Sequence, residues 1–213
     1  MNITYLGHSS FRIKTSTGVI VTDPFDKKIG LHFPRKEADI VTISHGHSDH
    51  NNKTGIKNDD AFFVHGPGEY EIKDIMIKGI KTFHDDKNGE DRGMNTVYMM
   101  EIEDVTVTHL GDLGHELSAK QLKELETTDV LMIPVGGVYT IDPRVAINTI
   151  KHIEPSIVIP MHYKVDGMSE MFNQLATLDD FVKEFELEPN KMDKLTVSAS
   201  SLPDEMELVV LER

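Results

Sequence analysis

The stretch that decides the fold is Asp39-Ile-Val-Thr-Ile-Ser44, followed directly by His45-Gly-His-Ser-Asp-His50. The first part is a short apolar run of the kind that suits a buried strand. The second part holds four side chains that can bind a metal ion, and they cannot all lie on one face of a helix or strand. A loop that leaves a strand end can curl around a point and direct all four inward. The stretch therefore predicts a strand that ends in a metal-binding loop.

Composition narrows the kind of metal site. The chain has 11 histidines and no cysteine, which excludes thiolate ligands, iron–sulfur clusters, disulfides and a Cys nucleophile. His45 and His47 are two residues apart, so both can point the same way from an extended segment and bind one metal. Asp49 and His50 suit a second metal nearby. Each ion needs further ligands from elsewhere in the chain.

Three later positions can supply those ligands. His84 follows Lys81-Thr-Phe83, Asp112 lies just past the strand that ends at His109, and His162 follows Ile157-Val-Ile-Pro-Met161. Each position alone is weak evidence, because a single histidine at a strand end is more often structural. All three follow apolar strands, however, so we expect them to converge on the same edge of a sheet.

The chain changes character along its length. Strands are expected in the first half over Asn2–Leu6, Ser10–Thr15, Gly18–Thr22, Asp39–Ser44, Ala61–His65, Glu69–Thr82, Thr96–Glu101 and Val105–His109. In the second half they are expected over Asp129–Val135, Ser156–Met161, Leu195–Ala199 and Glu205–Leu211. Helices are expected to begin after Ser118, Asp142 and Thr177, residues that can cap a helix. The pattern predicts an α/β layered sandwich in a single domain over residues 1–213.

Charge and hydropathy suggest the environment and the partners. The formal net charge of −14 repels phosphate backbones, so a nucleic-acid partner is disfavoured and a small-molecule substrate is expected. The start, Met1–Leu6, lacks a basic region before an apolar run, and no stretch reaches the roughly 20 apolar residues of a membrane span. We therefore expect a cytoplasmic protein without a membrane partner, and we leave a homo-oligomer open.

The ordered set of candidate ligands resembles the motifs of the metallo-β-lactamase superfamily, and the resemblance spans nearly the whole chain. Gly7-His8-Ser9-Ser10, Thr22-Asp23-Pro24 and Ile159-Pro-Met-His-Tyr163 look most like the branch that contains ascorbate-6-phosphate lactonase and related small hydrolases. The resemblance implies a four-layer αβ/βα sandwich with two metal ions at one edge of its two sheets. The implied ligands are His45, His47 and His84 for one metal, Asp49, His50 and His162 for the other, and Asp112 as a bridge.

The resemblance also implies a reaction. Two divalent ions, with zinc the first choice and manganese or iron as alternatives, would share a hydroxide that attacks a small ester, lactone or phosphodiester. Asp49 would orient this nucleophile. His8 would stabilise charge or protonate the leaving group, with a structural role equally open. Tyr163 is a candidate hydrogen-bond donor to an oxyanion.

Several softer signals surround these residues. Asp23 and Asp85 are candidates to orient the metal ligands, or are plain turn residues. Gly136-Gly137 follows a strand and could approach a substrate phosphate, although it lacks the spacing of a phosphate-binding loop. Arg92 could bind an anionic substrate, with an exposed surface role the alternative. The remaining histidines are expected to be structural or exposed, and His109 is the least certain of them because it lies near Asp112.

Three other functions compete with small-molecule hydrolysis. A nuclease or phosphodiesterase shares the motifs, but the appended domains of the RNA-processing nucleases are not expected here. A di-iron reductase on the same fold usually carries Glu at the position of His47 and depends on a flavin domain. A non-catalytic metal-binding module would be expected to have lost ligands, and none is missing. Metal identity and turnover assays separate these alternatives.

Overall fold

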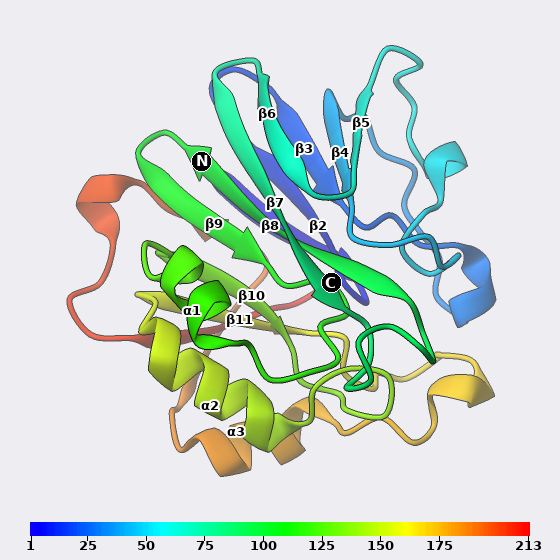
Figure 1. Cartoon of the computed structure of the whole chain (residues 1–213). Helices are drawn as coiled ribbons and strands as arrows, with labels where there is room; N and C mark the ends of the chain where they lie inside the picture. Colours follow the sequence, from blue (N-terminus) through cyan, green and yellow to red (C-terminus); the bar gives the residue numbers. More distant parts are fainter.

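The computed structural model describes all 213 residues and consists of two β-sheets packed face to face (Figure 1). The six-stranded sheet has the order β13-β1-β2-β3-β4-β5. Its strands are β1 (Asn2–Gly7), β2 (Ser10–Lys14), β3 (Val19–Thr22), β4 (Ile40–Ile43), β5 (Phe62–His65) and β13 (Leu195–Thr196). Strand β2 is antiparallel to both β1 and β3, and β3 is parallel to β4. Strands β1, β3 and β4 therefore run in one direction and end at the same edge.

The eight-stranded sheet has the order β12-β14-β11-β10-β9-β8-β7-β6. Its strands are β6 (Gly68–Ile72), β7 (Ile75–Phe83), β8 (Met94–Ile102), β9 (Val105–His109), β10 (Val130–Pro134), β11 (Ile157–Met161), β12 (Pro189–Met192) and β14 (Glu207–Leu211). Strand β8 is antiparallel to β7 and β9, and β9, β10 and β11 are parallel. Strands β7, β9 and β11 therefore also end at one edge.

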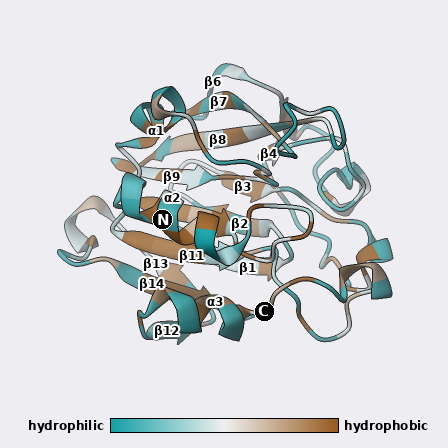
Figure 2. Cartoon of the chain, turned by 60° about the horizontal axis from the view of Figure 1, so that its bottom comes forward, coloured by the Kyte–Doolittle hydropathy of each residue, from teal (hydrophilic) through white to brown (hydrophobic).

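The core follows from the alternation of side chains along each strand. Ile20 and Ile40 face the other sheet and belong to the central cluster, whereas Val21 and Val41 point to the outer side of the six-stranded sheet. Strands at the middle of the molecule are hydrophobic, and the loops and turns around them are mostly hydrophilic (Figure 2). The apolar area removed from water in this double-sided arrangement is the main force that holds the sheets together.

Three α-helices cover the outer face of the eight-stranded sheet, next to β10 and β11 (Figure 1). They are α1 (Ala119–Leu125), α2 (Pro143–Ile153) and α3 (Leu178–Phe185). The predicted N-caps are confirmed, since the side chains of Ser118, Asp142 and Thr177 each accept a hydrogen bond from the first turn. No helix of the chain is both long enough and apolar enough to span a membrane, and α2, the longest, has 11 residues.

The outer face of the six-stranded sheet differs from the expected helical layer. It is covered by loops and the short 3₁₀ turns η1 (Lys27–Ile29), η2 (Lys53–Gly55) and η3 (Glu170–Phe172). Their apolar side chains, Phe25 and Phe33 among them, pack on the sheet. Pro24, Gly30 and Pro34 interrupt this segment, and such residues prevent a regular helix. The α/β sandwich is confirmed, with this layer made of irregular chain.

Two strand boundaries also differ from prediction. The expected strand Glu69–Thr82 is a hairpin, because Lys73 and Asp74 adopt φ angles of 54° and 60° and form the turn between β6 and β7. The expected strand Leu195–Ala199 is only two residues long, and Ala199 begins a 3₁₀ turn. The strand β12, which pairs with β14, was not predicted.

Tyr98 links the two sheets close to the end of β4. It lies on β8 and is fully buried, and its hydroxyl donates to the carbonyl oxygen of Ile43 (2.9 Å) while accepting from the N–H of Gly66 (2.9 Å). We expect Tyr98→Phe to lower the free energy of unfolding by about 1–3 kcal/mol, because it leaves buried backbone groups unpaired.

Urea unfolding measures this loss. Tyr70→Phe is the matched control, because the Tyr70 hydroxyl donates to the same turn (Gly66, 3.2 Å) from a partly buried position. A Tyr98→Phe variant that unfolds at the wild-type midpoint would show that the bridge between the sheets is not stabilising.

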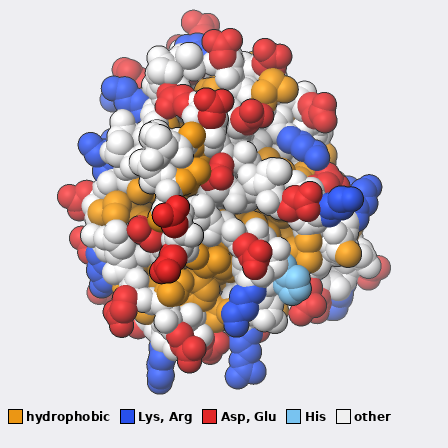
Figure 3. Space-filling view, turned by 90° about the vertical axis from the view of Figure 1, so that its left-hand side faces the viewer, with side chains coloured by type: hydrophobic (Ala, Val, Ile, Leu, Met, Phe, Trp, Pro, Cys, Tyr) orange, Lys and Arg blue, Asp and Glu red, His pale blue; other side chains and the backbone are white.

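Charged side chains are dispersed over the surface. On the face shown in Figure 3, acidic side chains are spread widely, with Lys and Arg side chains among them and apolar atoms between. The formal net charge of −14 is therefore not collected in one patch on this face.

Candidate metal centre

The candidate ligands all lie in loops that directly follow strands. Because the strands concerned run in one direction within each sheet, their carboxyl ends meet at one edge. These loops are His8 after β1, Ser44–His50 after β4, His84 after β7, Leu110–Asp112 after β9 and His162 after β11. The structure thus brings both sheets' contributions to a single point.

Asp112 is the centre of this arrangement. Its Oδ2 atom lies 3.1 Å from Nε2 of His50 and 3.3 Å from Nε2 of both His84 and His162. The Nε2 atom of His45 is 3.8 Å away. All five side chains are buried. One carboxylate therefore faces four imidazoles from three separate loops.

The candidate ligand atoms form three overlapping groups, and within each the atoms lie within 4.8 Å of one another. The groups are His45, His47 and His84; His8, Asp49, His50 and His162; and His45, His50 and Asp112. All seven expected ligands are brought together. His8 joins them through its Nε2, 3.3 Å from Oδ2 of Asp49. His47 is the most exposed member of the set, so the site opens to solvent on its side.

Unpaired buried atoms test whether these residues fit a metal ion. Among the seven expected ligands, five buried atoms make no hydrogen bond, namely His50 Nε2, His84 Nδ1, Asp112 Oδ1 and both ring nitrogens of His162. Buried polar atoms are nearly always hydrogen-bonded, so such a concentration needs a partner of another kind. Imidazole nitrogens and carboxylate oxygens are the ligands that zinc, manganese and iron share. The residues therefore fit divalent cations.

The electrostatics of the group favour bound cations as well. Burial disfavours a proton on His50, but the carboxylates of Asp112 and Asp49 outweigh it and raise the pKa of His50 well above its usual value. Burial opposes the charge of Asp112, yet the imidazoles of His162 and His50 hold its pKa well below the usual range. Burial and the nearby His50 lower the pKa of His45. The site thus keeps ionised carboxylates that attract positive charge, and a divalent cation bound there would displace the proton from His50.

Asp23 orients the metal-binding loop, as one of its two predicted roles required. It is fully buried, and its carboxylate accepts from the N–H and the hydroxyl of Ser44 (2.7 and 2.6 Å). It also contacts Nδ1 of His50 at 2.9 Å, which leaves Nε2 of that ring to face Asp112. A carboxylate on the far nitrogen of a ligating histidine fixes the ring and raises its basicity.

Asp85 has the second of its two expected roles, that of a turn residue. Its carboxylate accepts four backbone hydrogen bonds, from Lys87, Gly89, Asp91 and Arg92, at 2.7–3.1 Å. Partial burial opposes its charge, but these bonds outweigh that effect and lower the pKa of Asp85 to about 2. It therefore makes the loop between β7 and β8 rigid and binds none of the candidate ligands.

Comparison with known proteins identifies the family. Residues 2–162 match the model of the β-lactamase superfamily domain. A metal-dependent hydrolase of the UPF0173 family from Bacillus mycoides is 30% identical over 194 aligned residues, which cover 76% of this chain and 85% of the relative. This chain belongs to the metallo-β-lactamase superfamily. Within it, the chain is a member of the UPF0173 family, and the resemblance inferred from its motifs is confirmed.

Two further proteins of the superfamily are similar to this chain and support the same assignment. A UPF0173 metal-dependent hydrolase from Methanopyrus kandleri is 28% identical over 193 aligned residues, covering 76% of this chain and 84% of the relative. The crystal structure of a Thermotoga maritima protein assigned as a Zn-dependent hydrolase of the superfamily matches with a TM-score of 0.78 and 35% identity. That match covers 99% of this chain and 97% of the other, so the fold extends over nearly all of the chain.

Two buried residues position the loop of Asp112 in this superfamily member: Asn95, which the sequence analysis did not single out, and His109, which it noted only for its closeness to Asp112. Asn95 on β8 accepts from the N–H of Asp112 (2.9 Å) and donates to the carbonyl oxygen of Leu110 (2.9 Å). His109 Nε2 donates to the carbonyl oxygen of Ser9 (2.8 Å), and its Nδ1 accepts from the N–H of Gly111 (3.2 Å). His109 thereby joins the loop of Asp112 to the loop of His8 in the other sheet.

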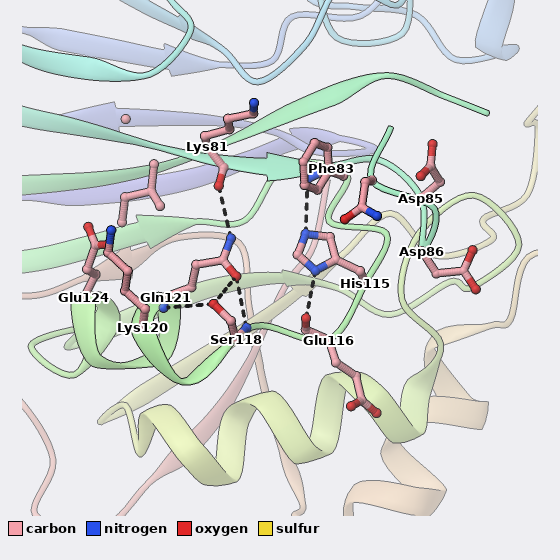
Figure 4. Close-up of a pocket in the computed structure, with 13 residues that line it drawn as sticks. Lys81, Phe83, Asp85, Asp86, His115, Glu116, Ser118, Lys120, Gln121 and Glu124 are labelled. Atoms are coloured by element: carbon pink, nitrogen blue, oxygen red, sulfur yellow. Dashed lines mark hydrogen bonds between the residues drawn. The ribbon is translucent and has the colours of Figure 1, made fainter. Parts of the chain in front are cut away.

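Contacts from α1 and its preceding loop hold the end of β7, next to His84. In Figure 4, His115 Nε2 accepts from the N–H of Phe83 (3.1 Å), and its Nδ1 donates to the carbonyl oxygen of Glu116 (2.7 Å). Gln121 on α1 donates to the carbonyl oxygen of Lys81 (3.1 Å). The structural role expected for His115 is therefore to support the residue that precedes a candidate ligand.

Tyr163 packs next to Tyr5, and its expected role as an oxyanion donor stays a prediction. The chain turns at His162, whose φ is 53°. The ring of Tyr163 packs on that of Tyr5, with centroids 6.4 Å apart. Tyr163 lines a cavity of about 410 Å³ with Leu178 and Arg213, and no candidate metal ligand lines this cavity.

Gly136 has a packing role, and the expected phosphate contact of Gly136 and Gly137 stays a prediction. A Cβ atom at Gly136 would collide with the carbonyl oxygen of His162. The N–H of Ala176 donates to the carbonyl oxygen of Gly136 (2.8 Å). Gly136 therefore allows two loops to pack closely behind His162.

Proposed function

We propose that this protein is a hydrolase that uses two divalent metal ions to cleave a small ester, lactone or phosphodiester. The observation that carries the proposal is the position of Asp112, whose Oδ2 lies 3.1–3.8 Å from imidazoles of both ligand groups. A carboxylate shared in this way is suited to bridge two ions. We assign His45, His47 and His84 to one ion, and His8, Asp49, His50 and His162 to the other.

The metal ions would supply Lewis acidity at the scissile carbonyl or phosphoryl oxygen and would activate water as the nucleophile. Asp49 is only partly buried and faces His8 and His50 at 3.3 and 3.6 Å. Its carboxylate can therefore accept a hydrogen bond from the attacking water and orient it. Asp23 holds the ring of His50, and Asn95 holds the loop of Asp112, so the donor atoms are positioned before substrate arrives.

Zinc is the first metal to test, because the Thermotoga maritima relative is assigned as Zn-dependent. Manganese and iron are the alternatives for a set of histidines and aspartates. We also propose a small molecule as substrate and the cytoplasm as compartment, since the chain is acidic and has no cysteine. The oligomeric state is left to measurement.

Metal reconstitution combined with a substrate screen tests this function. The protein would be stripped with a chelator, reloaded with Zn²⁺, Mn²⁺ or Fe²⁺, and assayed with 4-nitrophenyl esters, simple lactones and bis(4-nitrophenyl) phosphate. We expect about two equivalents of metal per chain and turnover of at least one class only in the reloaded protein. Turnover that persists after verified metal loss, or metal binding at full occupancy without turnover of any class, contradicts the proposal. The second result would favour a metal-binding module.

A further inference from the structure

A cleft opens beside the candidate metal centre. It has a volume of about 800 Å³, and His84 lines it together with residues of the loop between β7 and β8, the segment Val138–Asp142 and Val145. Arg92 lines the same cleft. The cleft is wide enough for a small molecule, and one of its walls is a candidate metal ligand.

The backbone of Arg92 is fixed relative to His84. The N–H of Arg92 donates to Oδ2 of Asp85 (2.7 Å), the residue that follows His84. The carbonyl oxygen of Gly93, the next residue after Arg92, accepts from the N–H of His84 (3.0 Å). The side chain of Arg92 therefore extends from a part of the loop whose backbone is fixed to that of His84 and Asp85.

The side chain of Arg92 is held by an aromatic ring and leaves its donors free. The guanidinium carbon lies 4.7 Å from the ring centroid of Tyr139, and the Tyr139 hydroxyl donates to the carbonyl oxygen of Met171 (2.7 Å). Stacking of this kind fixes the plane of a guanidinium and leaves its N–H edges open.

No acid neutralises this guanidinium, although the chain has a net charge of −14. The ion pairs made by lysine and arginine side chains involve Lys73, Lys78, Lys87 and Arg144. Two acids that line the same cleft are engaged elsewhere, because Asp85 accepts four backbone N–H groups and Asp91 pairs with Lys87 at 2.7 Å. Asp142 accepts from the first turn of α2. Arg92 is thus a free, oriented cation in an acidic protein.

We propose that Arg92 binds an oxyanion of the substrate, a carboxylate or a phosphate separate from the scissile bond. This inference rests on the proposed function, since the scissile bond would lie at the metal centre. A planar guanidinium binds either group through two parallel hydrogen bonds. Arg92 would thereby select anionic substrates and orient the bond to be cleaved.

Apolar side chains near Tyr139 indicate that another part of the substrate is apolar. Val138 is 50% exposed and Met171 is 60% exposed. The ring of Phe172 lies 5.9 Å from that of Tyr139 and 5.4 Å from that of His8, so the aromatic contacts run from the cation to the metal centre. Exposed apolar residues in a group of this kind usually mark a binding surface. The substrate would therefore carry an apolar segment between its anionic group and its scissile bond.

A matched pair of esters tests the selectivity. 4-Nitrophenyl hemisuccinate and 4-nitrophenyl butyrate share a leaving group and have acyl chains of equal length, but only the first has a terminal carboxylate. We expect Arg92→Ala to lower the ratio of their kcat/KM values by about 10- to 100-fold, and Arg92→Lys to restore part of it. Arg144→Ala, the same change on the exposed start of α2, should keep the wild-type ratio. An unchanged ratio in Arg92→Ala overturns the proposal.

A binding measurement separates this inference from the proposed hydrolysis. Calorimetry with the metal-stripped protein would measure the dissociation constants of monomethyl succinate and methyl phosphate, and their order shows which oxyanion is preferred. We expect at least about 10-fold weaker binding of the preferred anion in Arg92→Ala than in wild type and in Arg144→Ala. Equal binding in all three proteins, or no wild-type binding at millimolar concentration, overturns the role of Arg92. If wild type cleaves neither ester, ester hydrolysis fails and the calorimetry still decides the role of Arg92.

Discussion

Replacing Asp112 by asparagine is expected to remove bound metal and to lower kcat/KM by at least about 1000-fold, roughly 4 kcal/mol of transition-state stabilisation. The Oδ2 atom of Asp112 lies 3.1–3.8 Å from Nε2 of four histidines. An amide keeps the shape of the side chain but loses its charge and its ability to bridge two cations. The variant should therefore lose metal binding in both ligand groups at once. Elemental analysis and turnover on the same preparation measure the two losses.

The matched control is Asp193→Asn, which makes the same chemical change at an exposed position between β12 and β13. It should keep metal content and turnover within about twofold of wild type. The site would have to be reassigned if Asp112→Asn retained two equivalents of metal. If it lost only one equivalent, Asp112 would serve a single ion and the bridging role would be wrong.

The meeting of distant ligands could be anticipated from sequence because strand direction decides which loops come together. His84, Asp112 and His162 each follow an apolar strand, and those strands run parallel to one another within the eight-stranded sheet. Metal binding by the His45–His50 loop could be predicted from the spacing of its own residues alone. The resemblance to the superfamily added the division of these ligands between two ions, which the geometry accommodates.

The groups that position the ligands could not be predicted in the same way. Asn95 lies 17 residues from Asp112 and acts through hydrogen bonds to the backbone N–H of Asp112 and the carbonyl oxygen of Leu110. His109 contacts the carbonyl oxygen of Ser9, 100 residues away. In the sequence, both are ordinary polar residues within or at the end of a strand. Their role exists only once β1, β8 and β9 are assembled, so it depends on tertiary contacts that no local pattern encodes.

The local pattern missed the turn between β6 and β7. The residues from Tyr70 to Ile77 contain no glycine or proline, and aromatic and β-branched residues recur among them, which favours one long strand. The structure instead turns at Lys73 and Asp74, whose positive φ angles of 54° and 60° are those of a tight hairpin turn. Tyr163 is adjacent to His162 in sequence, but its ring packs on that of Tyr5.

Removal of metal is expected to lower the melting temperature by about 5–10 °C. A ligand that binds only the folded state stabilises it by about 2.7 kcal/mol at a free concentration of 100 times its dissociation constant. For a chain of 213 residues, about 1 kcal/mol corresponds to a shift of roughly 2–4 °C. The cluster gives a structural reason for a large effect, because five buried atoms of His50, His84, Asp112 and His162 make no hydrogen bond. Without cations these atoms stay buried and unpaired.

Differential scanning calorimetry before chelation, after chelation and after zinc is returned measures the shift. The Asp112→Asn variant is the internal control, since chelation should change its melting temperature by less than about 2 °C if it holds no metal. A wild-type melting temperature that stays constant after verified metal loss would mean that the cations do not contribute to folding. The loops after β1, β4, β7, β9 and β11 would then be held by the protein contacts alone, with Asp23, Asn95 and His109 sufficient to keep the site assembled.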